Sequence, residues 1–435
     1  MEGTLDTILY PEREAWPRLM QRGITDTSAV RETVAAVLAD VRRRGDQALL
    51  EYEERFDGVT LTSLSVSEAE MAEAESLVGE PLKEALAVAA ANIRHFHEAQ
   101  RMQPISVVTT GGVTCSQRAV PIQKVGLYVP GGTAPLFSTV LMLAIPAKIA
   151  GCRQIVLCTP PDRQGKIHPA ILYAARMAGV TEIYKAGGSQ AIAAMAYGTE
   201  TVPRVYKIFG PGNRFVMEAK QQASVQNVAI DMPAGPSEVM IIADGEANPT
   251  FVAADFLSQA EHGADSQSIL LTTDRTLAEK VADETERLLT ALPRRDLIRR
   301  SLSHSRIIVL ANEDEMMDFA NEYAPEHLII NHKEADRLAE RVENAGSVFL
   351  GAYACESAGD YASGTNHTLP TSGYAHAYSG VNLDSFMKKI TFQTLSEEGI
   401  ANLGPVIETL AENEELMAHK LAATVRINAI KEKKL

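Results

Sequence analysis

Residues 124–158 read KVGLYVPGGTAPLFSTVLMLAIPAKIAGCRQIVLC, and this stretch decides the fold class. Short apolar runs at 124–129 and 154–158 flank a helical pattern at 138–150. A short apolar run between turn residues is typical of a buried strand, and strands that alternate with helices indicate βαβ units. The stretch therefore predicts two strands of a parallel sheet joined by a helix.

The same alternation continues along the chain and predicts an α/β protein with two doubly wound, incomplete Rossmann-like parallel sheets. Strands of the first sheet are expected at 124–129, 154–158, 182–185, 205–209 and 227–230. Strands of the second sheet are expected at 238–243, 268–272, 306–310, 328–330 and 347–350. Helical patterns at both ends of the chain predict terminal helical segments, the last of them at 396–435.

Composition narrows the class of protein. Hydrophobic residues make up 46% and charged residues 22%, as in a packed globular protein. The net charge of −15 disfavours binding to nucleic acid or to an anionic membrane. The first residues lack the basic and apolar regions of a signal peptide, so we expect a cytoplasmic protein. Its four cysteines are then expected to be reduced rather than paired.

Three glycine turns follow strands of the first sheet, where an open parallel sheet binds its ligands. They are 130–132 (PGG), 187–190 (GGSQ) and 210–213 (GPGN). Glycine lets a ligand approach the backbone, and a helix N-terminus offers free N–H groups to phosphate. None of the turns is a G-x-G-x-x-G, so a dinucleotide site and three ordinary tight turns both stay open.

Two pairs of polar residues are candidates for metal binding and acid–base chemistry. Gln259 and His262 lie three apart near a helix end, so they share one face and could bind zinc. Glu326 and His327 follow Pro325 and place a carboxyl beside an imidazole. For each pair a structural interpretation stays open, a polar helix end for the first and an ion-paired surface turn for the second.

A long stretch with little periodicity, 351–380, is rich in glycine and hydroxyl residues. Loops of this length inside a compact domain are usually functional. The stretch also carries residues of the types that bind metals and substrates, namely Glu356, Asp360, Asn366 and His367. The sequence thus indicates an active site in this loop.

At this point the chain resembles the histidinol dehydrogenase family over residues 33–427. The resemblance is carried by several long motifs in the same order, namely VGLYVPGG (125–132), GPGN (210–213), AGPSE (234–238), SQAEHG (258–263), YAPEHL (323–328) and GDYASGTNH (359–367). It implies oxidation of L-histidinol to L-histidine, the last steps of histidine biosynthesis, with zinc and NAD.

The resemblance also implies roles for individual residues. Zinc would be held by Gln259, His262, Asp360 and His419, with His419 supplied by the partner subunit of a homodimer. These four residues would also contact the substrate, together with Ser237, His327, His367 and Glu414. NAD would contact Tyr128, Gln190 and Asn213. Glu326 and His327 would be the catalytic pair.

These inferences predict four parts of the chain. A helical segment would span 1–23, and a first α/β domain would combine 24–129 with 238–381. An NAD-binding α/β domain would span 130–237. A C-terminal helical segment, 382–435, would reach the partner subunit.

Converting a primary alcohol to a carboxylate removes four electrons, so two NAD molecules would be reduced in sequence through an aldehyde. His327 would accept the alcohol proton, and Glu326 would activate the water that adds to the aldehyde. A thiolate route through Cys115 or Cys152 is the competing mechanism, although neither residue has neighbours that indicate a lowered pKa.

Three other functions stay open. A related dehydrogenase could act on another small hydroxyl compound, such as a sulfonated diol. A non-enzymatic binding protein with two α/β lobes would not need Glu326 and His327. A zinc hydrolase would leave the glycine turns without a purpose.

Overall fold

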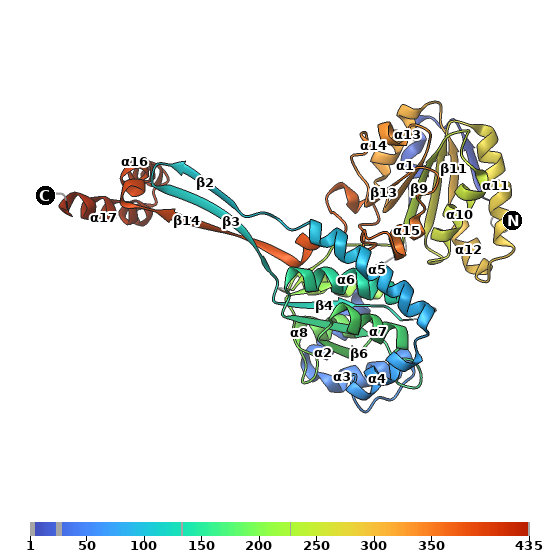
Figure 1. The fold of residues 1–435 in the computed structure, drawn as a ribbon, viewed down its shortest axis with the longest axis horizontal. Coiled ribbons are helices and arrows are strands. Elements are labelled where there is room, and N and C mark those ends of the chain that lie inside the picture. The colour runs from blue at the N-terminus through green and yellow to red at the C-terminus, as the bar shows by residue number, and fades with distance from the viewer. Residues whose placement is uncertain (1–4, 23–27, 132–133, 227, 434–435) are drawn as a thin grey trace. The chain divides into compact units, whose positions relative to one another are not determined.

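The computed structural model describes residues 5–22, 28–131, 134–226 and 228–433 (Figure 1). Residues 1–4, Gly132 of the first glycine turn and Asn227 of a predicted strand lie outside these ranges. The chain forms two compact units. Unit 1 comprises Met1–Ala99 and Ile122–Phe386, and unit 2 comprises Gln100–Pro121 and Met387–Leu435.

Unit 1 contains a six-stranded parallel sheet with the order β1-β11-β10-β9-β12-β13. Its strands are β1 (Asp6–Leu9), β9 (Glu238–Ala243), β10 (Gln267–Thr272), β11 (Arg306–Val309), β12 (His327–Asn331) and β13 (Ser347–Leu350). One face packs against α10 (Pro249–Ala260), α11 (Arg275–Leu289) and α12 (Arg295–Leu302). The other packs against α1 (Trp16–Leu19), α13 (Glu313–Tyr323) and α14 (Ala335–Ala339). Every residue of β9, β10 and β12 is buried, as expected for strands covered on both faces.

A second parallel sheet of unit 1 has the order β6-β5-β4-β7-β8. Its strands are β4 (Lys124–Tyr128), β5 (Gln154–Thr159), β6 (Glu182–Lys185), β7 (Lys207–Phe209) and β8 (Ala229–Ile230). One face of this sheet packs against α2 (Ser28–Arg44), α3 (Asp46–Tyr52), α8 (Gly188–Tyr197) and α9 (Arg214–Ser224). Helix α6 (Phe137–Ala150) contacts β4 and β5 and packs against α5 (Glu80–Ala99) and α7 (Pro169–Ala178), and α4 (Glu68–Leu77) packs against α7.

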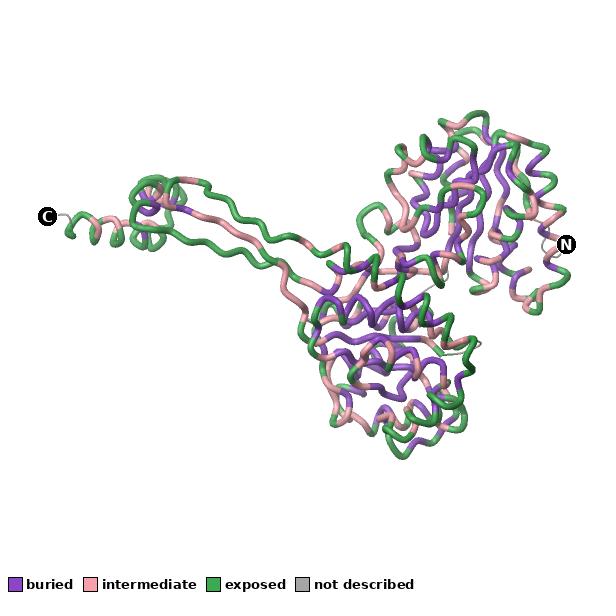
Figure 2. The backbone as a smooth tube through the Cα atoms, viewed as in Figure 1, coloured by how far each residue is buried: buried purple, intermediate pink, exposed green. Residues whose placement is uncertain are grey.

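Unit 2 is a three-stranded antiparallel sheet with two helices. It contains β2 (Ile105–Thr110), β3 (Val113–Pro121), β14 (Met387–Leu395), α16 (Glu397–Asn413) and α17 (Met417–Lys433). Figure 2 shows that its strands are largely exposed or half-buried, whereas the strands of the two parallel sheets are mostly buried. Among the described helices of the chain, none combines the length and the apolarity needed to cross a membrane.

The predicted fold class is confirmed, and so is the helical tail after Ser396. Strand β1 was not predicted, because it has only four residues and lies at a sheet edge, where its mostly exposed side chains leave little pattern. The antiparallel pairing of β14 with β3 was also not predicted, because these exposed strands lie far apart in the sequence and no local pattern shows that they pair.

Candidate active site

Glu326 and His327 lie where α13 gives way to β12. Helix α13 ends at Tyr323, and Ala324 adopts a left-handed conformation with a φ of 52° before Pro325. This turn directs the chain into the sheet, where both side chains are buried. The surface-turn interpretation of this pair is therefore wrong.

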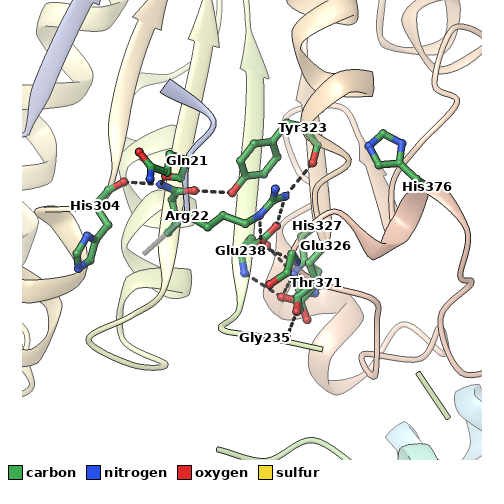
Figure 3. A network of polar contacts seen from close by, with 12 residues as sticks. Gln21, Arg22, Gly235, Glu238, His304, Tyr323, Glu326, His327, Thr371 and His376 are labelled. Carbon is green, nitrogen blue, oxygen red and sulfur yellow. Dashed lines mark hydrogen bonds and ion pairs between the residues drawn. The ribbon is translucent and has the colours of Figure 1, made fainter. Parts of the chain in front are cut away.

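The backbone of Glu238, the first residue of β9, contacts both side chains (Figure 3). Its N–H donates to Oε2 of Glu326 at 2.8 Å. Its carbonyl oxygen lies 3.2 Å from Nδ1 of His327. Since a carbonyl oxygen only accepts, this contact places a proton on Nδ1. Nε2 of His327 is then the nitrogen that is available for chemistry.

Carboxyl groups surround the imidazole. Although burial opposes the charged form, the nearby Glu356 and Glu326 raise the pKa of His327 to about 10. Burial raises the pKa of Glu326 to about 8, even though His327 and the Glu238 N–H stabilise its carboxylate. Two titratable groups with strongly shifted pKa values in one buried place are typical of an acid–base site.

Three ligand-type side chains converge beside this pair. His262 follows the end of α10, and Glu356 and Asp360 lie in α15 (Glu356–Tyr361). One ligand atom of each lies within 4.8 Å of the others, and Nε2 of His262 is 4.0 Å from Oδ2 of Asp360. Gln259, one turn before His262, is buried, and its hydrogen-bond partners orient its amide nitrogen toward Glu356. An imidazole with carboxylates is a donor set that suits zinc.

Two buried polar atoms face each other at this place. Nε2 of His327 and Oδ1 of Asp360 are 3.5 Å apart. Apart from this ion-pair contact, neither atom has a hydrogen-bond partner within the described part of the chain. Because burying a polar atom without a partner costs free energy, the arrangement fits a site that binds a cation or a polar ligand there.

The remaining predicted substrate residues of unit 1 border the same centre. Nδ1 of His367 lies 2.9 Å from the carbonyl oxygen of Asp360, and its Nε2 lies 3.1 Å from Oγ1 of Thr139 in α6. Ser237 immediately precedes Glu238. Unit 1 thus contains all the predicted catalytic, metal and substrate residues except two. Those two, Glu414 and His419, are exposed residues of unit 2.

A cavity of about 1000 Å³ opens beside the second sheet, where β4, β5 and β6 end. Tyr128, Gln190 and Asn213 all line it, although Tyr128 ends β4 and the other two come from two separate glycine turns. Asn213 caps α9 by accepting hydrogen bonds from the N–H groups of Phe215 and Val216. The cavity has the size and the position expected for a nucleotide site.

Buried charged residues hold two of these turns. Oε1 of Glu53 accepts hydrogen bonds from the N–H of Gly187 and from the side-chain amide of Gln190, each at 3.0 Å. In another turn, Gly210 has a φ of 130°, and a Cβ there would collide with the carbonyl of Tyr128. Asp231 and Lys220, themselves a buried ion pair, bind the N–H and the carbonyl of Gly210, each at 2.8 Å.

All four cysteines are free, as predicted. Cys152 is buried, and burial raises the pKa of its thiol to about 12. Cys115 lies on β3 of unit 2. We therefore expect the Cys115→Ala, Cys152→Ala double variant to keep full activity, measured as kcat for both oxidation steps. A double variant that folds but has lost activity would support the competing thiolate mechanism.

Sequence reasoning missed three residues that organise these sites, namely Arg22, Glu53 and Glu238. Each acts through partners far away in the chain, so no local spacing reveals it. For Glu238 the sequence did offer a signal, because this acidic residue directly precedes the apolar run VMIIA of a predicted strand. A charge in such a position needs a partner when it is buried.

The two parallel sheets, the cavity and the buried acid–base site together define an α/β enzyme. A family profile described as histidinol dehydrogenase matches residues 20–427. A histidinol dehydrogenase of Bacteroides thetaiotaomicron is 59% identical over 98% of this chain and 99% of its own. That of Escherichia coli strain K12 is 53% identical over 95% of each chain. The crystal structure of histidinol dehydrogenase from Elizabethkingia anophelis has a TM-score of 0.97 at 52% identity and covers 99% of this chain and 100% of its own. The chain belongs to the histidinol dehydrogenase family, whose members are oxidoreductases.

Proposed function

We propose that this protein oxidises L-histidinol to L-histidine through L-histidinaldehyde, in two successive NAD-dependent steps that complete histidine biosynthesis in the cytoplasm. The observation that carries the proposal is the buried approach of His327 to Asp360, whose polar atoms face each other at 3.5 Å and have no hydrogen-bond partner among the described residues. A substrate bound there would find an acid–base pair and a cation site together. Such an arrangement suits the oxidation of an imidazole-bearing alcohol better than it suits the rival functions.

The acid–base roles follow from the hydrogen bonds. With Nδ1 held by the carbonyl of Glu238, Nε2 of neutral His327 accepts the proton of the substrate hydroxyl. The neutral fraction of His327 grows as the pH rises toward its pKa of about 10. Glu326, beside it, takes a proton from the water that adds to the aldehyde. In each step bound NAD would accept one hydride.

Zinc is the metal that the donor set fits best. His262 and Asp360 would hold it, with Gln259 at the edge of the cluster and Glu356 orienting the Gln259 amide. When bound, zinc would fix the imidazole end of the substrate as a Lewis acid without any change of oxidation state. The surrounding residues of this chain then keep the hydroxyl carbon close to His327.

A substrate panel tests this function against its rivals. The zinc-loaded protein is mixed with NAD and either L-histidinol or a small sulfonated diol, and NADH formation is followed. We expect NADH only from L-histidinol, with L-histidine as product. NADH from the diol alone would indicate the related dehydrogenase, and no NADH from either compound would favour a binding protein.

The cavity beside the second sheet is our proposed NAD site, with Tyr128, Gln190 and Asn213 as contacts. Its dependence on Glu53 gives a prediction. In Glu53→Ala the Gly187 N–H and the Gln190 amide lose a buried acceptor, a loss worth about 1–3 kcal/mol. We expect the KM for NAD to rise roughly tenfold, since about 1.4 kcal/mol corresponds to a factor of ten.

Matched variants control this measurement. Glu53→Gln keeps an acceptor oxygen and should stay near the wild-type KM, and so should Glu54→Ala, which alters the exposed neighbour. A Glu53→Ala protein with unchanged KM for NAD would contradict the assignment of the cavity.

We further propose a homodimer in which Glu414 and His419 complete the site of the partner subunit. Both residues are exposed in unit 2. Unit 2 also exposes many apolar side chains, which a small unit alone leaves uncovered. They are Ile105, Val107, Val108, Ile390, Phe392, Leu395, Val406, Leu410, Leu416, Met417, Leu421 and Val425. A second copy of the chain would bury them and supply the missing metal ligand.

Mixing two inactive variants tests the shared site. His262→Ala and His419→Ala subunits are unfolded together and refolded, and kcat is measured. Because a heterodimer would contain one site with both histidines and one with neither, activity should return to roughly a quarter of the wild-type value. Each variant refolded alone is the control. No recovery in refolded dimers would place both histidines in the same subunit's site.

A further inference from the structure

We propose that Arg22 and Glu238 form a positioning pair that holds Glu326 and His327 in the geometry needed for oxidation. The inference rests on the proposed function, because it assumes that these two residues carry the chemistry. Neither Arg22 nor the side chain of Glu238 touches the proposed substrate position. They act through the backbone and through the turn that carries the acid–base pair.

The pair is a two-pronged ion pair in the interior (Figure 3). Nε of Arg22 donates to Oε1 of Glu238 at 2.6 Å, and Nη2 donates to Oε2 at 2.9 Å. The Glu238 side chain is only 2% exposed. The guanidinium also lies over the ring of Tyr323, 3.9 Å from its centre. Such a fork fixes direction as well as distance, which an ammonium group would not do.

Glu238 connects this ion pair to both catalytic candidates. Its side chain is held by Arg22, while its N–H binds Glu326 and its carbonyl binds Nδ1 of His327. A rotation of the backbone at Glu238 would move the N–H that binds the Glu326 carboxylate. It would also move the carbonyl that keeps the proton on Nδ1 of His327. The backbone at the start of β9 therefore positions both Glu326 and His327.

Arg22 also holds the other end of the catalytic segment. Nη2 donates to the carbonyl of Tyr323 at 2.8 Å, at the start of the turn that leads to Glu326. Oε1 of Glu238 accepts a further hydrogen bond from the N–H of Ser372 at 2.7 Å, in the loop that follows His367. The Arg22–Glu238 pair thus joins the three segments that surround the acid–base pair.

Glu238→Gln and Arg22→Gln test the proposal in the zinc-loaded full-length protein. We expect each to lower kcat about 10²-fold, the effect of a displacement of roughly 1 Å. The KM for NAD should stay within about twofold, because the cavity beside the second sheet is not disturbed. The double variant should lose no more than either single variant, since both remove the same interaction.

Two further measurements separate positioning from mere stability. Arg22→Lys keeps the charge but loses the fork, and we expect an intermediate kcat. ¹⁵N NMR of His327, recorded at a pH above its pKa so that the ring is neutral, should show the proton on Nδ1 in the wild type and a mixture of tautomers in Glu238→Gln. Arg13→Gln, which breaks the exposed ion pair with Asp318, is the matched control and should behave as wild type.

The outcomes are distinguishable. Wild-type protein that makes no NADH from L-histidinol would refute the proposed function. Active wild type with folded Arg22→Gln and Glu238→Gln variants of normal kcat would overturn the positioning pair alone. If Arg22→Gln does not fold, the test rests on Arg22→Lys and Glu238→Gln. Normal kcat and an unchanged His327 tautomer in both variants would then overturn the positioning pair.

Discussion

Replacing Glu326 by Gln is expected to slow the oxidation of L-histidinaldehyde about 10²–10⁴-fold, the usual contribution of a general base. The glutamine keeps the size of the side chain and can still accept the hydrogen bond from the Glu238 N–H. It cannot take a proton from water. Oxidation of the alcohol, in which His327 is the proton acceptor, should fall much less.

The two steps are measured separately, with L-histidinol or L-histidinaldehyde as substrate and NADH formation as the signal. Glu322→Gln, an exposed substitution four residues earlier, serves as the control. If the aldehyde step survived in Glu326→Gln while the alcohol step failed, the roles of Glu326 and His327 would have to be exchanged.

A His262→Ala variant is expected to lose its zinc and nearly all of its activity. Among the described residues, His262 supplies the imidazole of the cluster that it forms with Glu356 and Asp360. Loss of a residue that only supports a metal ligand typically costs 10–100-fold in affinity, so loss of a ligand should cost at least about 100-fold. Zinc per subunit after dialysis against a chelator measures this directly.

His95→Ala is the matched control, because His95 is exposed on α5, which contributes no residue to the cluster. It should retain one zinc ion per subunit under the same dialysis. Full zinc content in His262→Ala would mean that the cation site lies elsewhere, even if the activity were lost.

Much of the fold could be predicted because parallel strands covered on both faces are short, apolar and bounded by turns. Strand β9 was predicted with its observed bounds, Glu238–Ala243, since all six residues are buried. Strands β1 and β14 were not predicted, because they lie at a sheet edge or on an exposed ribbon. Their side chains meet water on one or both faces, so the sequence carries little periodic signal there.

The candidate site was predictable where its residues are neighbours in the chain, as with Glu326 and His327. The approach of Asp360 to His262 was implied by the family resemblance, and no spacing within the sequence requires it. Glu53 and Arg22 could not be found in this way. Glu53 is more than 130 residues from the two groups that it binds, and Arg22 is 216 residues from Glu238. Tertiary packing alone creates those contacts.

The yield of NADH per molecule of L-histidinol tests the central claim most directly. The zinc-loaded protein is given limiting L-histidinol and excess NAD at alkaline pH, where more of His327 is neutral, and the product is identified. The account predicts two NADH and one L-histidine for each L-histidinol consumed. A yield of one NADH, with the aldehyde as the final product, would contradict it.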